Sequence, residues 1–255
     1  MRYPVVIKQL KNLLSFLTIF PITMDKDMLT DCARNMWAFP LIGAFIGLLA
    51  GFFGWVAYHF LPGIVVGALV LALLLLITGL HHTDGLLDFG DGVMAHGTPE
   101  HKIEVMHDQL TGAGGLTLGM MTLLISALAT GQLHSSIIIQ SIIVVEASAK
   151  LSMVVAAWAG KSTHEGMNSA FLQAMHGPHG NLRLMVAVIV AFLIGVVLLG
   201  WAGIFAVLVS LITGLTMVAI AHKNFGGVTG DVFGATNELA RMVCVIVLLA
   251  VLAWV

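Results

Sequence analysis

Long apolar stretches separated by short polar segments run along almost the whole chain, and this pattern predicts membrane-spanning helices. A helix needs about 20 mainly apolar residues to cross a bilayer. Seven stretches approach that length: Phe39 to Phe60, Pro62 to Leu80, Leu116 to Gly131, Ser135 to Gly160, Leu184 to Gly200, Ala202 to His222, and Leu239 to Val255. The segments after the second, fourth and sixth stretches are longer and polar. We therefore expect an all-α integral membrane protein, a single polytopic domain over residues 1–255 with about seven transmembrane helices.

The first 20 residues have the pattern of an amphipathic helix that lies on the membrane surface. Its apolar side chains are expected to face the membrane interior: Val6, Leu10, Leu13 and Leu17. Lys8 and Lys11 are expected to face the anionic headgroups. A cleaved signal peptide is the alternative, but no small-residue cleavage site follows Pro21.

A second short surface helix is expected after Gly97, because Thr98 can cap its first turn and Pro99 suits its first position. Its apolar residues Ile103, Met106 and Leu110 are expected to face the bilayer.

Composition and charge distribution support the membrane assignment and give it an orientation. Hydrophobic residues make up 59% of the chain and charged residues only 9%, whereas about a quarter of a soluble domain is charged. The long-loop side carries all but one of the basic residues: Arg2, Lys8, Lys11, Lys26, Arg34, Lys102, Lys161, Arg183, Lys223 and Arg241. Such a bias predicts that the N-terminus and the long loops of this multi-pass protein are cytoplasmic and the C-terminus is outside. The expected location is a prokaryotic cell membrane.

The partner expected from composition is the lipid bilayer, and no nucleic-acid partner is expected. The sequence leaves open whether the chain forms a homo-oligomer. The two cysteines, Cys32 and Cys244, form neither a disulfide framework nor a zinc pattern.

The stretch from Gly79 to Gly92 contains the strongest candidate for chemistry. On a helix, its aspartates Asp84, Asp88 and Asp91 fall within an arc of roughly 60°. Three carboxylates on one face repel one another, and a divalent cation with oxygen ligands is the usual resolution. We therefore expect a metal site here. Asp108, after the second surface helix, is available to the same site, although it can equally be a solvated surface acid.

A Gly-rich segment before the last apolar stretch is a second candidate. Gly227, Thr229 and Gly230 offer backbone amides and a hydroxyl to phosphate oxygens, and Asp231 and Glu238 offer metal ligands or a general base. Glycine is also ordinary in packed membrane helices, so the motif by itself is weak. The three cytoplasmic segments 79–115, 160–183 and 222–241 are therefore expected to carry the active site.

Basic residues could neutralise phosphate charge, and Lys102, Lys161 and Arg183 are the candidates. His176 and His179 have the spacing of a metal site but are more often solvated. Within the fourth apolar stretch Glu146 and Lys150 are four residues apart and are expected to pair, as a structural ion pair or as one wall of a polar pocket.

At this point several motifs resemble those of one known family. The string G-x-x-H-x-D-G-x-x-D-x-x-D-G, from Gly79 to Gly92 with His82 in the histidine position, resembles the cobalamin synthase family, adenosylcobinamide-GDP ribazoletransferase. Further similar segments are found in the family's order: Phe16-Leu17-Thr18 with Pro21, Glu104 to Asp108 followed by Gly112, and Gly226 to Glu238. Leu110 departs from the basic residue that many members carry near that position, and Lys102, Lys161 or Arg183 could substitute for it.

The resemblance implies a Mg²⁺-dependent phosphotransferase that joins adenosylcobinamide-GDP to α-ribazole or its 5′-phosphate and releases GMP. It implies Mg²⁺ on Asp84, Asp88, Asp91 and Asp108, an orienting role for His82, and Asp231 as a ligand or as the base that accepts the ribazole proton.

Two rival functions are weighed against this one. A CDP-alcohol phosphatidyltransferase also uses spaced aspartates, but Leu87-Asp88 stands where that family has Ala-Arg. An ion-coupled transporter could use the pair of Glu146 and Lys150, but transporters place coupling residues near the midplane, whereas nearly all charge here lies on one face.

Overall fold

The computed structural model describes residues 5–20, 28–162 and 167–253, and for Val5 to Ile7 and for Met167 it describes the backbone only. The described residues form an all-α structure without strands, which confirms the predicted fold class. The elements are α1 Val5–Leu17, α2 Met28–Arg34, the 3₁₀ helix η1 Met36–Ala38, α3 Phe39–Ala57, α4 Gly63–Ile77, α5 His81–Met94, α6 Pro99–Met106, α7 Ala113–Thr130, α8 Ile138–Ala159, α9 Met167–His176, α10 Gly180–Phe225 and α11 Gly230–Leu252.

Helix α8 forms the centre of the bundle. It packs against α3, α10 and α11, and nearly every side chain of its last four turns is buried. Gly43, Gly47 and Gly51 of α3 allow this contact. A Cβ at Gly43 or Gly47 would lie within 2.5 Å of a backbone oxygen of α8, and one at Gly51 would lie 2.9 Å from the Cα of Ile139. Small residues that let backbones approach closely are the usual means of helix packing in membranes.

Within the described residues, five helical segments are long and apolar enough to span a membrane: η1 with α3, then α7, α8, α10 and α11. The pair α4 and α5 would add a sixth only if it were counted as one bent span. Helix α4 has 15 residues and α5 has 14, so neither is long enough alone. The predicted second span is thus shorter than expected, and the seventh begins at Gly230 rather than at Leu239.

The fifth and sixth predicted spans belong to the single helix α10, which is broken at Gly200. Gly200 has φ 55° and ψ −126°, and beyond it the chain folds back so closely that a Cβ at Gly203 would lie 2.0 Å from the carbonyl oxygen of Gly195. Each part of α10 is at least 20 residues long, or about 30 Å, so the two predicted spans are both present within it.

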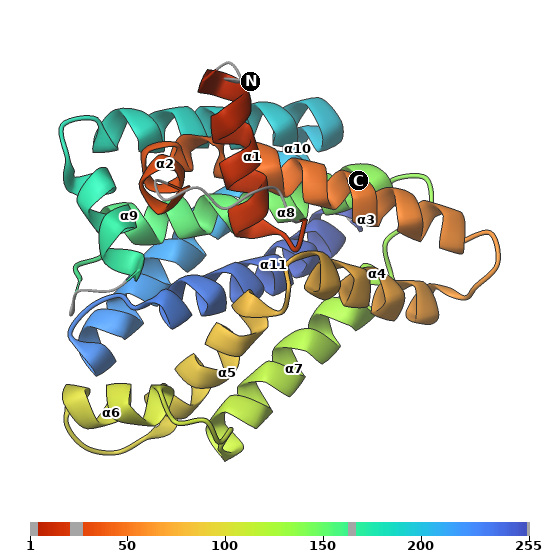
Figure 1. Ribbon diagram of the computed structural model, residues 1–255. Coiled ribbons are helices and arrows are strands. Elements are labelled where there is room, and N and C mark those ends of the chain that lie inside the picture. The colour runs from red at the N-terminus through yellow and green to blue at the C-terminus, as the bar shows by residue number, and fades with distance from the viewer. Residues whose placement is uncertain (1–4, 21–27, 163–166, 254–255) are drawn as a thin grey trace.

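The chain turns by 96° between α4 and α5. Gly79 and Leu80 both adopt positive φ, 66° and 64°, and the backbone N–H of Leu80 donates to the carbonyl of Leu75 at 3.0 Å. A leucine in this region is strained, and the turn directs α5 away from α4. Figure 1 shows α5 and α7 running side by side below the rest of the bundle, with α6 beyond them.

The two short surface helices are present. In α1, Leu13 and Leu17 are buried against the protein and Leu10 is 49% exposed, while Val6 lies outside the described side chains. In α6, the Thr98 hydroxyl accepts from the backbone N–H of His101, as the capping pattern predicts. The expectation that Ile103 and Met106 face the bilayer is wrong: both are buried, and Met106 packs against Gly92.

Candidate functional site

The three predicted aspartates of α5 do lie on one helix. The segment His81–Met94 is α-helical, so Asp84, Asp88 and Asp91 share one face. Asp84 is exposed, whereas Asp88 and Asp91 are partly buried.

The Gly-rich segment brings a fourth aspartate to the same place. Gly226, with φ 76°, ends α10, and Thr229 caps α11 by accepting from the backbone N–H of Val232 at 3.4 Å. This turn puts Asp231 in the first turn of α11. Helices α5 and α11 then pack through glycines: a Cβ at Gly85 would lie 2.9 Å from the Cα of Asp231, and one at Gly234 would lie 2.9 Å from the carbonyl oxygen of His82.

The electrostatics of Asp88 show that the four carboxylates act on one another. Burial, together with the negative charges of Asp84, Asp231 and Asp91, raises the pKa of Asp88 to about 7. A carboxyl group whose pKa is raised to about 7 by burial and like charges still holds its proton in part of the molecules near neutral pH. Perturbed carboxyl groups of this kind are concentrated at functional sites.

Asp91 has a different environment from the other three. Its carboxylate accepts hydrogen bonds from the backbone N–H groups of Gly112 at 2.7 Å and Gly115 at 2.8 Å, at the start of α7. These amides belong to the group that a helix leaves unpaired at its N-terminus. Asp91 therefore ties α5 to α7 and fixes the orientation of the aspartate-bearing face.

Asp108 lies outside this arrangement. It is exposed after α6, and its Oδ1 accepts from the backbone N–H of Leu110 at 3.1 Å. Within the described ranges it makes no hydrogen bond or ion pair with the other aspartates. Its neighbour His107, which the sequence analysis did not select, lies close enough to Asp231 to act on it electrostatically when protonated. The sequence does contain a reason to select His107, because it lies in the segment Glu104 to Asp108, directly before the selected aspartate Asp108.

The donor set suits a hard divalent cation, because it consists of carboxylate oxygens that repel one another. Among the described residues, no three His, Cys, Asp or Glu side chains already stand in positions that would surround one ion. Among the described residues, backbone N–H groups of a neighbouring helix donate to Asp91 but not to Asp84, Asp88 or Asp231, so these three could hold a metal with the least rearrangement.

Glu238 and His82 lie deeper in the bundle than the aspartates. Glu238 is 1% exposed and pairs with Arg241, which also pairs with Glu146 of α8. Lys150 donates to Asn237 at 2.6 Å and lies 3.7 Å from Glu146, so the predicted pair of Glu146 and Lys150 is present as part of a larger network. Glu238 is thus separated from the Gly-rich turn that it was expected to assist.

The ring of His82 is buried beside this network. Burial, then the positive charges of Lys150 and Arg241, lowers the pKa of His82 well below its usual value, so the ring is neutral. Its Nδ1 atom has no hydrogen-bond partner in the part of the chain that the structure describes. His82 therefore lies between the aspartates and the buried network of Glu146, Lys150, Glu238 and Arg241. It belongs to the contact by which α5 packs against α11.

The three predicted basic residues lie in different places. Lys102 donates to the carbonyl of Val93 at 3.3 Å and to Asn224 Oδ1 at 2.8 Å, which ties α6 to α5 and α10. Lys161 is exposed beside the Gly-rich turn, and its carbonyl accepts from the backbone N–H of Val228 at 2.8 Å. Arg183 lies in the first turn of α10 and donates to the carbonyls of Arg34 and Ala174.

The remaining residues of the Gly-rich turn differ in how open they are. Gly227 and Thr229 are buried, whereas Gly230 is exposed and nothing lies within 4 Å of where its Cβ would be. The turn is braced by the segment before α9, because Ser162 pairs with Val228 in an isolated parallel β-bridge.

Comparisons with known proteins agree with the motifs. The family model described as cobalamin-5-phosphate synthase matches residues 9–249. Three curated relatives are named adenosylcobinamide-GDP ribazoletransferase. The relative from Methanococcoides burtonii is 31% identical over 94% of this chain and 90% of its own. One from Methanocella arvoryzae is 35% identical over 95% of this chain and 96% of its own. A third of that name, from Geotalea daltonii, is 32% identical over 93% of this chain and 95% of its own. No solved structure matches the chain.

Proposed function

The chain belongs to the cobalamin-5-phosphate synthase family, and from that premise we propose that it is a membrane-embedded transferase that joins adenosylcobinamide-GDP to α-ribazole and releases GMP. The names of the relatives support the reaction class. The observation that carries the proposal is the gathering of Asp84, Asp88, Asp91 and Asp231 from two helices, with the pKa of Asp88 raised to about 7 by burial and by the other three charges.

We further propose that Asp84 and Asp88 hold Mg²⁺, that Asp91 orients them and that Asp108 joins when substrate binds, which leaves Asp231 as the base. The metal would neutralise the diphosphate charge and align the phosphorus that is attacked. The support is the chemistry of the donor set: carboxylates that repel one another in a partly buried site favour a hard cation.

The proposed roles of the chain's own residues follow from their positions. The hydroxyl of ribazole would form a bond to the cobinamide-side phosphorus, its proton would pass to Asp231, and the bond from that phosphorus to GMP would break with the electron pair leaving on GMP. Gly230 leaves open space at the start of α11 where a phosphate oxygen could lie. His107, whose charge acts on Asp231, adds a positive group when protonated.

The acceptor is proposed to be α-ribazole or its 5′-phosphate, and the family's description as a cobalamin-5-phosphate synthase favours the phosphorylated form. The site is proposed to face the cytoplasm, where the excess of lysine and arginine on the long loops would lie.

The test is GMP release from adenosylcobinamide-GDP by the purified full-length protein in detergent, with and without Mg²⁺ and with each acceptor. We expect release only when both Mg²⁺ and an acceptor are present, with loss on chelation and recovery when Mg²⁺ is added back. Absence of release with both present would reject the function, and unchanged release in excess chelator would reject the metal. The ratio of kcat/KM values for the two acceptors identifies the natural one.

A further inference from the structure

A cavity of about 410 Å³ lies between α2, α9 and the start of α10, within the size range of ligand sites. Figure 1 shows α2 and α9 near α1, away from α5, α6 and α7, which carry the aspartates Asp84, Asp88 and Asp91 or border them. The lining residues are Thr30, Ala33, Arg34, Ala170, Gln173, Ala174, Gly177, Pro178, His179 and Arg183. Among these described residues there are two arginines and a histidine but no aspartate or glutamate.

The two arginines differ in how they are held. The Nε of Arg183 donates to the carbonyl of Arg34 at 2.8 Å, and its Nη1 donates to the carbonyl of Ala174 at 2.5 Å. These bonds fix one guanidinium at the wall of the cavity. The guanidinium of Arg34 is exposed and has no hydrogen-bond or ion-pair partner in the described part of the chain. The nearest acid on α2, Asp31, accepts a hydrogen bond from Asn12 of α1 at 3.0 Å.

The cavity lies at the level where the membrane spans begin. Arg34 is two residues before the span that starts at Met36, and Arg183 is in the first turn of the span that starts at Gly180. Trp158, near the end of α8, donates from its indole Nε1 to Asn181 Oδ1 at 2.8 Å. Tryptophan with one polar contact and an exposed ring is typical of the membrane interface, which supports a position of the cavity near the lipid headgroups.

We propose that this cavity binds the phosphate group of an anionic phospholipid, with Arg34 as the group that pairs with it, Arg183 as the second cation and His179 as a polar part of the wall. Fixed guanidinium groups recognise phosphate by paired hydrogen bonds. Basic pockets between transmembrane helices on the cytoplasmic side are recurrent sites for phosphorylated headgroups.

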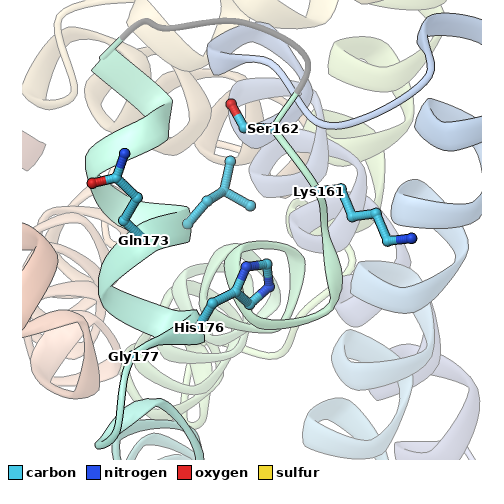
Figure 2. A pocket seen from close by; sticks show the side chains of 6 residues that line it. Lys161, Ser162, Gln173, His176 and Gly177 are labelled. Carbon is cyan, nitrogen blue, oxygen red and sulfur yellow. The ribbon is translucent and has the colours of Figure 1, made fainter.

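The neighbouring cavity makes a useful contrast. It shares Gln173 and Gly177 with the first and is also lined by Lys161, Ser162, Leu172 and His176. Figure 2 shows the ammonium group of Lys161 pointing away from Gln173 and His176, so the cations do not converge there. The Nε2 of His176 is within hydrogen-bond distance of the carbonyl of Trp158, at 3.1 Å. The lipid assignment is therefore confined to the cavity with the arginines.

The test uses the full-length protein in a neutral detergent, titrated with short-chain phosphatidylglycerol, with short-chain phosphatidylcholine and with free glycerol phosphate. The readout is the melting temperature as a function of ligand concentration. The variant is Arg34→Gln, and Lys223→Gln is the matched control because Lys223 is also exposed but does not line the cavity. Arg34→Gln should melt like the unchanged protein without lipid, because the Arg34 side chain makes no hydrogen bond or ion pair with the described residues.

We expect phosphatidylglycerol to raise the melting temperature, phosphatidylcholine to do so more weakly, and Arg34→Gln to weaken the response to phosphatidylglycerol about 10-fold, as the loss of one charge-assisted hydrogen bond implies. Lys223→Gln should respond like the unchanged protein. Equal responses of the two variants would overturn the proposal. An equal effect of free glycerol phosphate would overturn the assignment to lipid and identify a soluble phosphate compound as the ligand.

Discussion

Two clusters of charged side chains share helix α11 and differ in how their charge is compensated. At its first turn, Asp231 lies with Asp84, Asp88 and Asp91, all of one sign and partly open to solvent. Two turns further on, Glu238 and Arg241 form a network with Glu146 and Lys150, which is fully buried and has two charges of each sign. The uncompensated cluster is costly to the fold and is therefore the candidate for function, whereas the balanced one holds the helices together.

The largest expected effect is the loss of reaction when the uncompensated cluster loses one charge. Asp88→Asn should reduce GMP release by at least about 10³-fold, since it removes a proposed metal ligand without changing the shape of the side chain. The melting temperature should not fall, because one repelling charge is gone. Glu104→Gln, at an exposed acid on α6, should keep full turnover. Turnover retained in Asp88→Asn would remove Asp88 from the site.

The balanced cluster should show the reverse result, with loss of stability first. Arg241→Met leaves Glu146 and Glu238 buried with only Lys150 to oppose them, which costs about 3–5 kcal/mol when one partner of a buried pair is removed. The double variant Glu238→Gln with Arg241→Met restores one charge of each sign. We expect its melting temperature to lie clearly above that of the single variant. If the two melt alike, hydrogen-bond geometry and not charge balance stabilises this network.

A smaller change tests the contact that joins α5 to α11. Gly85→Ala would put a Cβ 2.9 Å from the Cα and carbonyl oxygen of Asp231, so the two helices must separate. A displacement on the order of 1 Å at a reacting group lowers a rate about 10²-fold, and GMP release should fall by roughly that factor. Gly230→Ala meets nothing within 4 Å and should melt normally. Unchanged turnover in Gly85→Ala would show that the spacing of Asp231 and Asp88 is unimportant.

The smallest expected effect is on the pH dependence of stability. The pKa of Asp88 is raised from 3.8 to about 7 in the folded protein, so the folded state binds this proton more tightly than the unfolded state does. Its contribution to stability is present below about pH 4 and is lost as the pH rises toward about 7. Without metal, the melting temperature should therefore fall between about pH 4 and 7, and Asp88→Asn should reduce that slope. Equal slopes would show that Asp88 titrates normally.

The sequence by itself determined the fold class and most of the spans, and it predicted a set of candidate residues for the chemistry. Apolar length is a local property, so the helices could be predicted, and the helical spacing of Asp84, Asp88 and Asp91 follows from three residue numbers. The two predicted spans within α10 were separable because Gly200, between them, adopts a conformation that leucine or valine would resist.

Only the tertiary structure decided which charges meet. Asp231 is more than 140 residues from Asp88, and its approach depends on glycine contacts at Gly85 and Gly234 that no local pattern records. Glu238 belongs to the same predicted motif as Asp231, yet two turns of helix carry its carboxylate into the bundle, where Arg241 and Asn237 contact it. Pairing in a membrane interior is decided by which side chains a packed helix brings within hydrogen-bond distance, since water is not there to solvate the rest.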